Sequence, residues 1–136
     1  MASNELTGRA RELLAEPNYA TLSTLRKDGT IHNVVVWVDV DDAGNVTANT
    51  AEGRVWRKNI TRNPTVTVTA YQKDNPYEFV SVTGTVVEDT HDGADEHIDA
   101  LAKKYLGVDS YPYRSEEEVR VRFTIKPEKV SFTKAG

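Results

Sequence analysis

The segment YATLSTLRKDGTIHNVVVWVDV, residues 19–40, decides the fold of this chain. Two apolar runs, 19–25 and 30–40, flank the turn RKDG, and the pair Asp28-Gly29 is a strong signal for a tight hairpin connection. The pattern predicts two antiparallel strands, the second running without interruption from Thr30 to Val40. Further strands and turns follow this hairpin along the chain.

The later strands are predicted over 46–50, 65–72, 77–88, 119–125 and 129–133. Helices are predicted from a cap at Ser3 or Asn4 to about Ala15, over 51–63 before Pro64, and over 94–106 before Gly107. Gly84 lies within a predicted strand, which indicates a bulge or a close approach of two backbones.

This order of elements contains no βαβ unit with a glycine-rich first turn, which argues against a Rossmann domain. It favours a mostly β protein of the α+β class, an antiparallel β-barrel capped by short helices. With 136 residues the chain suits one domain, residues 1–136, because two cores would each be marginal.

The composition of the chain limits the classes of function that it can serve. The sequence is 38% hydrophobic and 28% charged and has no cysteine, so disulfides and thiolate metal sites are excluded. It has no apolar stretch near the ~20 residues of a membrane helix and no secretory signal, so we expect a cytoplasmic protein without membrane contact. The net charge of −4 argues against a nucleic-acid partner.

The charge is unevenly distributed along the chain. Residues 54–62 carry four basic side chains and no acidic one, whereas residues 88–99 are rich in acids and lack Lys and Arg. A locally basic segment in an acidic protein indicates a small anionic ligand rather than a polymer.

The best candidate for that anion site is the junction from strand to helix at 49–54. The start of a helix offers unpaired N–H groups, and Arg54 and Lys58 share one helix face. Thr50 adds a hydroxyl and Asn59 an amide, so the arrangement suits a phosphate. The alternative is a solvated basic helix face.

Val36 and Trp37 could form a flat apolar wall for a planar cofactor, although a place in the core or a dimer interface is the simpler interpretation. His91 and His97 are better explained as part of an acid-rich helix start than as metal ligands. No nucleophile motif, P-loop or metal signature occurs, so we assign no catalytic residue and no metal.

The runs TLSTLRKDGTIHNVVVWV, TANTAEGRVWRKNITRNP, NPYEFVSVTGTV and ALAKKYLG together resemble the pyridoxamine 5′-phosphate oxidase-like split barrels. Within that superfamily the chain is similar to the actinobacterial branch that uses the deazaflavin coenzyme F420. The resemblance covers roughly residues 5–133, and its most specific parts are the GR-xxx-KN-xx-RNP run at 53–64 and PY-xxxxx-G at 76–84.

The resemblance implies an FMN-binding split-barrel type of fold and a homodimer with two cofactor sites at the subunit interface. It implies the following cofactor-binding set, in which the first four residues hold the phosphate and the last two lie near the ring: Thr50, Ala51, Arg54, Lys58, Val55, Asn59, Val36 and Trp37. Trp56 and Arg57 depart from some deazaflavin-using relatives at helix positions that contact the tail of the cofactor.

The expected function is an F420-dependent oxidoreductase that transfers a hydride between the deazaflavin and a small conjugated acceptor. Arg54, Arg57, Lys58 and Arg62 supply more positive charge than one FMN phosphate requires, which favours F420 with its oligoglutamate tail. The alternatives are an FMN-binding oxidoreductase, a non-catalytic carrier or sensor of F420 or flavin, and a heme-binding split barrel.

Overall fold

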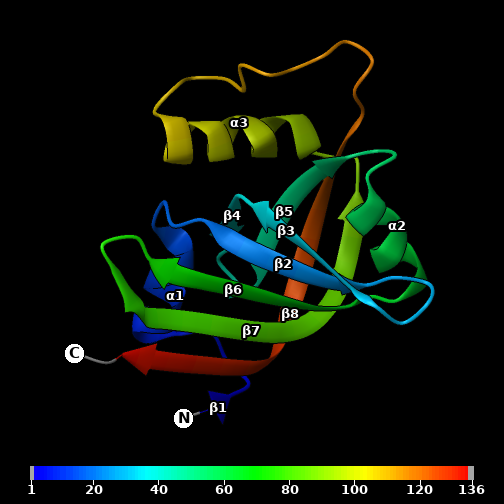
Figure 1. Ribbon diagram of the computed structural model, residues 1–136. Helices are drawn as coiled ribbons and strands as arrows, with labels where there is room; N and C mark the ends of the chain where they lie inside the picture. The colour runs from blue at the N-terminus through cyan, green and yellow to red at the C-terminus, as the bar shows by residue number, and fades with distance from the viewer. Residues whose placement is uncertain (1, 135–136) are drawn as a thin grey trace.

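The computed structural model describes residues 2–134 and places eight strands and three helices along them (Figure 1). In chain order the elements are β1 (Ala2–Ser3), α1 (Gly8–Ala15), β2 (Ala20–Leu25), β3 (Ile31–Val36), β4 (Val38–Val40), β5 (Val46–Ala51), α2 (Val55–Arg62), β6 (Thr65–Gln72), β7 (Asn75–Thr90), α3 (Ala94–Leu106) and β8 (Arg120–Lys134). Apart from the short β1, the elements follow the predicted order from α1 to β3.

All strands belong to one antiparallel sheet with the order β3-β2-β6-β7-β8-β5-β4, and β1 pairs with β8. The two edge strands, β3 and β4, follow each other in the chain and are separated by Trp37 alone. The sheet must therefore curl until its two edges lie close together, which makes it a barrel with one seam that has no strand pairing (Figure 1).

The prediction of one continuous strand over 30–40 is therefore wrong. β3 pairs with β2, and β4 pairs with β5 at the other edge of the sheet, so one straight strand could not serve both partners. The sequence does not reveal the break, because the residues on either side of Trp37 are both apolar. Val36 and Val38 are both buried in the structure.

A second difference concerns the C-terminal part of the sheet. The predicted strands 119–125 and 129–133 form the single strand β8, which crosses Pro127. The pairing of β7 with β8 shifts register beside Gly84, which lies opposite Pro127 and accommodates a residue that cannot donate a backbone hydrogen bond. A Cβ atom on Gly84 would lie 2.2 Å from the carbonyl oxygen of Lys126, so the predicted close approach of two backbones is confirmed.

Two helix starts also differ from the prediction. α1 begins after Thr7 rather than after Ser3 or Asn4, because residues 2–3 pair with β8 and Leu6 is buried in the core. α2 begins after Arg54, since residues up to Ala51 extend β5. The third helix, α3, has the predicted bounds, and Gly107 follows it with a φ of +73°.

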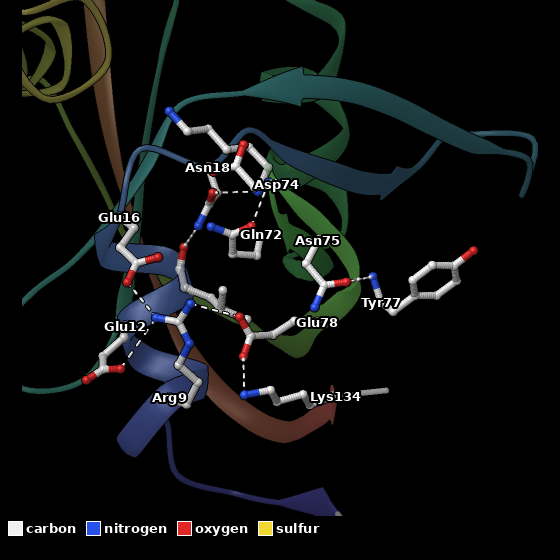
Figure 2. Close-up of polar contacts among 12 residues, drawn as sticks. Arg9, Glu12, Glu16, Asn18, Gln72, Asp74, Asn75, Tyr77, Glu78 and Lys134 are labelled. Atoms are coloured by element: carbon white, nitrogen blue, oxygen red, sulfur yellow. Dashed lines mark hydrogen bonds and ion pairs between the residues drawn. The ribbon is translucent and has the colours of Figure 1, made fainter. Parts of the chain in front are cut away.

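An ion-pair cluster ties α1 to the sheet (Figure 2). Glu78 of β7 is buried, and one of its carboxylate oxygens accepts a hydrogen bond of 2.8 Å from Arg9 of α1. Arg9 also pairs with Glu16, and Lys134 of β8 lies 3.8 Å from Glu78. The hydrogen bond from Arg9 lowers the pKa of Glu78, so the carboxylate stays ionised in its buried position.

Two side chains of α3 hold the seam of the barrel. The Tyr105 hydroxyl accepts a hydrogen bond from the backbone N–H of Val38 (3.1 Å) and donates one to the carbonyl of Asn18 (2.7 Å). Lys104 donates to the carbonyls of Val38 and Leu14. Burial lowers the pKa of Lys104 to about 8 and raises that of Tyr105 to about 12. Within residues 2–134, no helix is long and apolar enough to cross a membrane.

The packing at Gly84 yields a stability prediction. Gly84→Ala forces apart two strands whose backbones are in contact, so the free energy of unfolding should fall by at least about 2 kcal/mol. Urea denaturation measures the change. Ser81→Ala in the same strand should cost clearly less, and equal stability of the two variants would contradict the close approach.

Candidate functional site

A cavity of about 210 Å³ opens beside α3, which lies across one end of the barrel (Figure 1). Its walls come from β3, β5, the start of α2, α3, the segment 107–119 that follows α3, and the first residue of β8. The side chains that the later argument uses are Trp37, Asn49, Thr50, Arg54, Tyr111 and Arg120. Residues far apart in the sequence therefore meet at this end of the barrel.

One side of the cavity is apolar and aromatic. Trp37 stacks on Tyr105 with ring centroids 5.4 Å apart and an angle of 8° between the planes. Tyr111 meets Trp37 edge-on at 6.1 Å. Trp56 is buried against Phe123 at 5.0 Å, so it serves both as a core residue and as part of the cavity wall. This side offers flat surfaces to a planar ligand.

The polar side is organised by Asn49 of β5. Its amide nitrogen donates to the carbonyl of Ala94 (2.9 Å) and contacts Nδ1 of His97 (3.0 Å). Its amide oxygen accepts a hydrogen bond of 2.8 Å from Nε of Arg120. Since the amide nitrogen and the amide oxygen both have partners, the orientation of the Asn49 side chain is set, and Asn49 in turn holds Arg120 in place.

Two arginines that line the cavity approach the carboxylate of Glu118. Arg120, only 7% exposed, pairs with Glu118, and its guanidinium lies 5.2 Å from the ring centre of Tyr111. Arg54, the N-cap residue of α2, lies 3.9 Å from the other carboxylate oxygen of Glu118. α2 and β8 thus direct positive charge toward the same point.

His97 lies behind this polar side as a neutral base. Burial lowers its pKa to about 4, and the positive charge of Arg122 acts in the same direction. Because Asn49 donates to Nδ1, the proton of the neutral ring belongs on Nε2, which is buried and has no partner among residues 2–134. His97 therefore supports Asn49 and does not carry charge at neutral pH.

The cavity contains four of the eight predicted cofactor-binding residues: Val36, Trp37, Thr50 and Arg54. Ala51 is buried, Val55 is 52% exposed, and Lys58 is exposed on α2 outside the cavity. Asn59 is also buried, and its amide donates to Thr24 (3.0 Å) and accepts from Arg62 (2.8 Å). A ligand contact with Asn59 would require one of these bonds to break. For all eight residues, contact with a cofactor stays a prediction.

The basic segment 54–62 presents less free charge than its sequence indicates. Arg57 lies 3.1 Å from Asp89 and 3.6 Å from Glu52. Arg62 donates to the carbonyl of Leu25. Within residues 2–134, Lys58 is the cation of this segment that lacks an ion pair or a hydrogen bond from its side chain, while Arg54 has only the 3.9 Å contact with Glu118.

Several lining residues cannot be identified as site residues from the sequence, because the segments around them contain no ligand-binding motif. Arg120 reaches the cavity because β8 pairs with β5, with Ala51 opposite Arg120. Tyr111 and Tyr113 belong to the run YPYR, whose aromatic content was the one available indication. Among residues 2–134 there is no group of three or more His, Asp or Glu side chains placed to hold a metal ion.

Comparisons with known proteins agree with this architecture. The sequence profile of the pyridoxamine 5′-phosphate oxidase family matches residues 6–134, so the chain belongs to that family. The predicted fold, a mostly antiparallel split barrel with three short helices, is confirmed. No curated protein sequence matches the chain.

Solved structures give a finer picture. A structure titled F420 Reductase is 28% identical, with a TM-score of 0.80 over 89% of this chain and 94% of its own. The conserved hypothetical protein Rv2991 from Mycobacterium tuberculosis is 20% identical, with a TM-score of 0.74 over 97% of this chain and 88% of its own. A NimC/NimA family protein from Clostridium acetobutylicum is 16% identical, with a TM-score of 0.67 over 93% and 86%. The last two show the fold alone.

The buried neutral His97 predicts a dependence of stability on pH. The pKa of His97 is about 4 in the folded chain against 6.5 for a free side chain, so the unfolded chain takes up the proton first as the pH falls. The free energy of unfolding should be highest above pH 6.5 and decrease by up to about 2 kcal/mol between pH 6.5 and 5.

Urea denaturation across this range measures the effect. His97→Gln should flatten the slope, whereas His91→Gln, at an exposed histidine, should retain it. An unchanged slope in His97→Gln would contradict the assignment.

Proposed function

We propose that this chain is a reductase that binds coenzyme F420 and transfers a hydride from the reduced cofactor to a small conjugated acceptor. The observation that carries the proposal is one cavity with an aromatic wall at Trp37 and a cationic rim at Arg54, at the start of a helix. Membership in the pyridoxamine 5′-phosphate oxidase family and the 28% identity to a structure titled F420 Reductase support it.

The residues present suit a phosphate-bearing planar cofactor. The first turn of α2 has N–H groups without partners inside the helix, and Arg54, its N-cap, offers them no side-chain acceptor. Thr50 lines the same cavity with its hydroxyl, and Trp37 provides a face for a ring. Thr50, Arg54 and Lys58 would hold the phosphate, and Val36 and Trp37 would lie against the ring.

When bound, the deazaflavin supplies the hydride. The chain itself orients the ring through Trp37, holds the charged tail at α2, and keeps water from the apolar side of the cavity. Among the described residues, the lining of this cavity includes no Asp, Glu, His or Lys side chain; His97 behind it is neutral because its pKa is about 4, and burial raises the pKa of Tyr105 to about 12. We therefore propose that any proton the acceptor needs comes from solvent, and that His32 is dispensable.

FMN is the second candidate cofactor. The pairing of Arg57 with Asp89 and Glu52 reduces the charge available for an oligoglutamate tail, which favours a cofactor with a single phosphate. A non-catalytic carrier would use the same cavity.

Titration with F420 and with FMN, followed by absorbance, separates the two cofactors. Recovery of oxidised deazaflavin absorbance with a panel of enones and quinones then tests turnover. Protein that purifies with stoichiometric FMN and does not bind F420 would refute the F420 proposal. Tight binding of F420 without turnover would favour the non-catalytic carrier.

A charge-removal variant tests the phosphate site. Lys58→Ala should weaken cofactor binding by about 1.5–3 kcal/mol, because a charge-assisted hydrogen bond is lost. The apo protein should keep its melting temperature, since Lys58 is exposed. Lys27→Ala, in an exposed turn, is the matched control. A lower melting temperature of the apo protein together with unchanged cofactor affinity in Lys58→Ala would place the phosphate elsewhere.

We also propose that two copies of the chain form a homodimer that completes the site. The cavity of about 210 Å³ is smaller than the roughly 300–1,000 Å³ of most ligand pockets. Val35, which lines the cavity, is 66% exposed, and Ile31, further along the same face of β3, is 59% exposed, a costly arrangement for a monomer.

Light scattering should therefore report twice the 15.2 kDa mass of one chain. Ile31→Asp should shift the protein toward monomer and weaken cofactor binding, whereas Val87→Asp, which replaces a residue that is 56% exposed, should do neither. A wild-type monomer at micromolar concentration would contradict the dimer.

A further inference from the structure

We propose that Glu118 occupies an anion-binding site formed by Arg54 and Arg120, and that the phosphate of a bound ligand displaces this carboxylate. Glu118 would then be an intramolecular competitor that lowers the affinity of the cavity for anions. The identity of the ligand rests on the proposed function, but the site itself rests on the geometry of these three side chains.

The two arginines come from different elements and meet only at Glu118. One carboxylate oxygen of Glu118 pairs with Nη1 of Arg120, and the other lies 3.9 Å from Nη2 of Arg54. Arg54 and Arg120 both line the cavity. The carboxylate of Glu118 thus contacts two guanidinium groups that both border the cavity.

Burial explains why an anion is required at this point. Arg120 is 7% exposed, and a buried guanidinium without an anionic partner is strongly destabilising. Asn49 accepts a hydrogen bond only from the Nε of Arg120, so Glu118 provides the countercharge to this guanidinium. A phosphate carries more charge and more acceptor oxygens than a carboxylate and can bond both arginines in a bidentate manner.

Arg54 is held loosely enough to change partners. Its side chain is 60% exposed, and 3.9 Å exceeds the length of a hydrogen bond. It lies one turn before Lys58 on α2, so a ligand that reaches Arg54 also approaches the second free cation of that helix. Displacing Glu118 therefore costs little on the Arg54 side of the site.

The segment that carries Glu118 has its own anchors. Arg114 pairs with Asp99 at 2.6 Å and with Asp95 at 3.1 Å on α3, and the backbone N–H of Tyr111 donates to Asp99. On the other side of Glu118, the carbonyl of Val119 accepts a hydrogen bond from the backbone N–H of Glu52. The Glu118 side chain can consequently turn away without releasing the segment.

The test compares Glu118→Gln with Glu117→Gln, which removes the same charge from an exposed neighbour with no ion pair among the described residues. The probes are FMN against riboflavin, and F420 against its phosphate-free deazaflavin chromophore. Glu118→Gln should bind the phosphate-bearing member of each pair about fivefold or more tightly than wild type, the lower range of coupling between sites. It should bind the phosphate-free member as wild type does, and Glu117→Gln should change neither.

Inorganic pyrophosphate, followed by the fluorescence of Trp37 and Trp56, keeps the test independent of the proposed cofactor. If no flavin or deazaflavin binds, the proposed function fails, while tighter pyrophosphate binding by Glu118→Gln still supports the site. Equal affinities of Glu118→Gln and wild type for the phosphate-bearing probes would overturn the inference. Weaker binding would do so too, as would an equal gain for the phosphate-free probes or in Glu117→Gln.

Discussion

The passage of the chain across the barrel seam at Trp37 is the constraint on which the rest of the structure depends. β3 and β4 lie at opposite edges of the sheet, so the sheet has to close for one residue to join them. At the seam, Tyr105 and Lys104 bind the backbone of Val38 in place of a neighbouring strand. The same contacts fix α3 across the end of the barrel and leave a cavity beside Trp37.

The chemistry of that cavity follows from how the closed sheet aligns its strands. Pairing of β5 with β8 places Arg120 opposite Ala51, the last residue of β5, and Asn49 links Arg120 to α3. A second hollow of about 320 Å³, near Arg11 and Gly44, has no aromatic side chain in its lining. The combination of a flat apolar wall and converging cations thus distinguishes the site beside Trp37.

Local patterns in the sequence were sufficient for most elements and for part of the site. The Asp28-Gly29 turn, the close approach at Gly84 and the helix that ends before Gly107 required only turn chemistry and periodicity. The break at Trp37 was missed because buried valines on both sides look the same whichever edge they join. Arg120 and the pairing of Arg57 with Asp89 depend on strand register across distant residues, which no local pattern contains.

We propose that the cavity beside Trp37 holds the phosphate and ring of a flavin-type cofactor. A crystal structure of the protein with bound F420 is the decisive experiment. We expect the cofactor phosphate within hydrogen-bond distance of Arg54 and Thr50, with the deazaflavin ring against Val36 and Trp37. A phosphate bound instead in the hollow near Arg11, or a ring that does not touch Trp37, would contradict it.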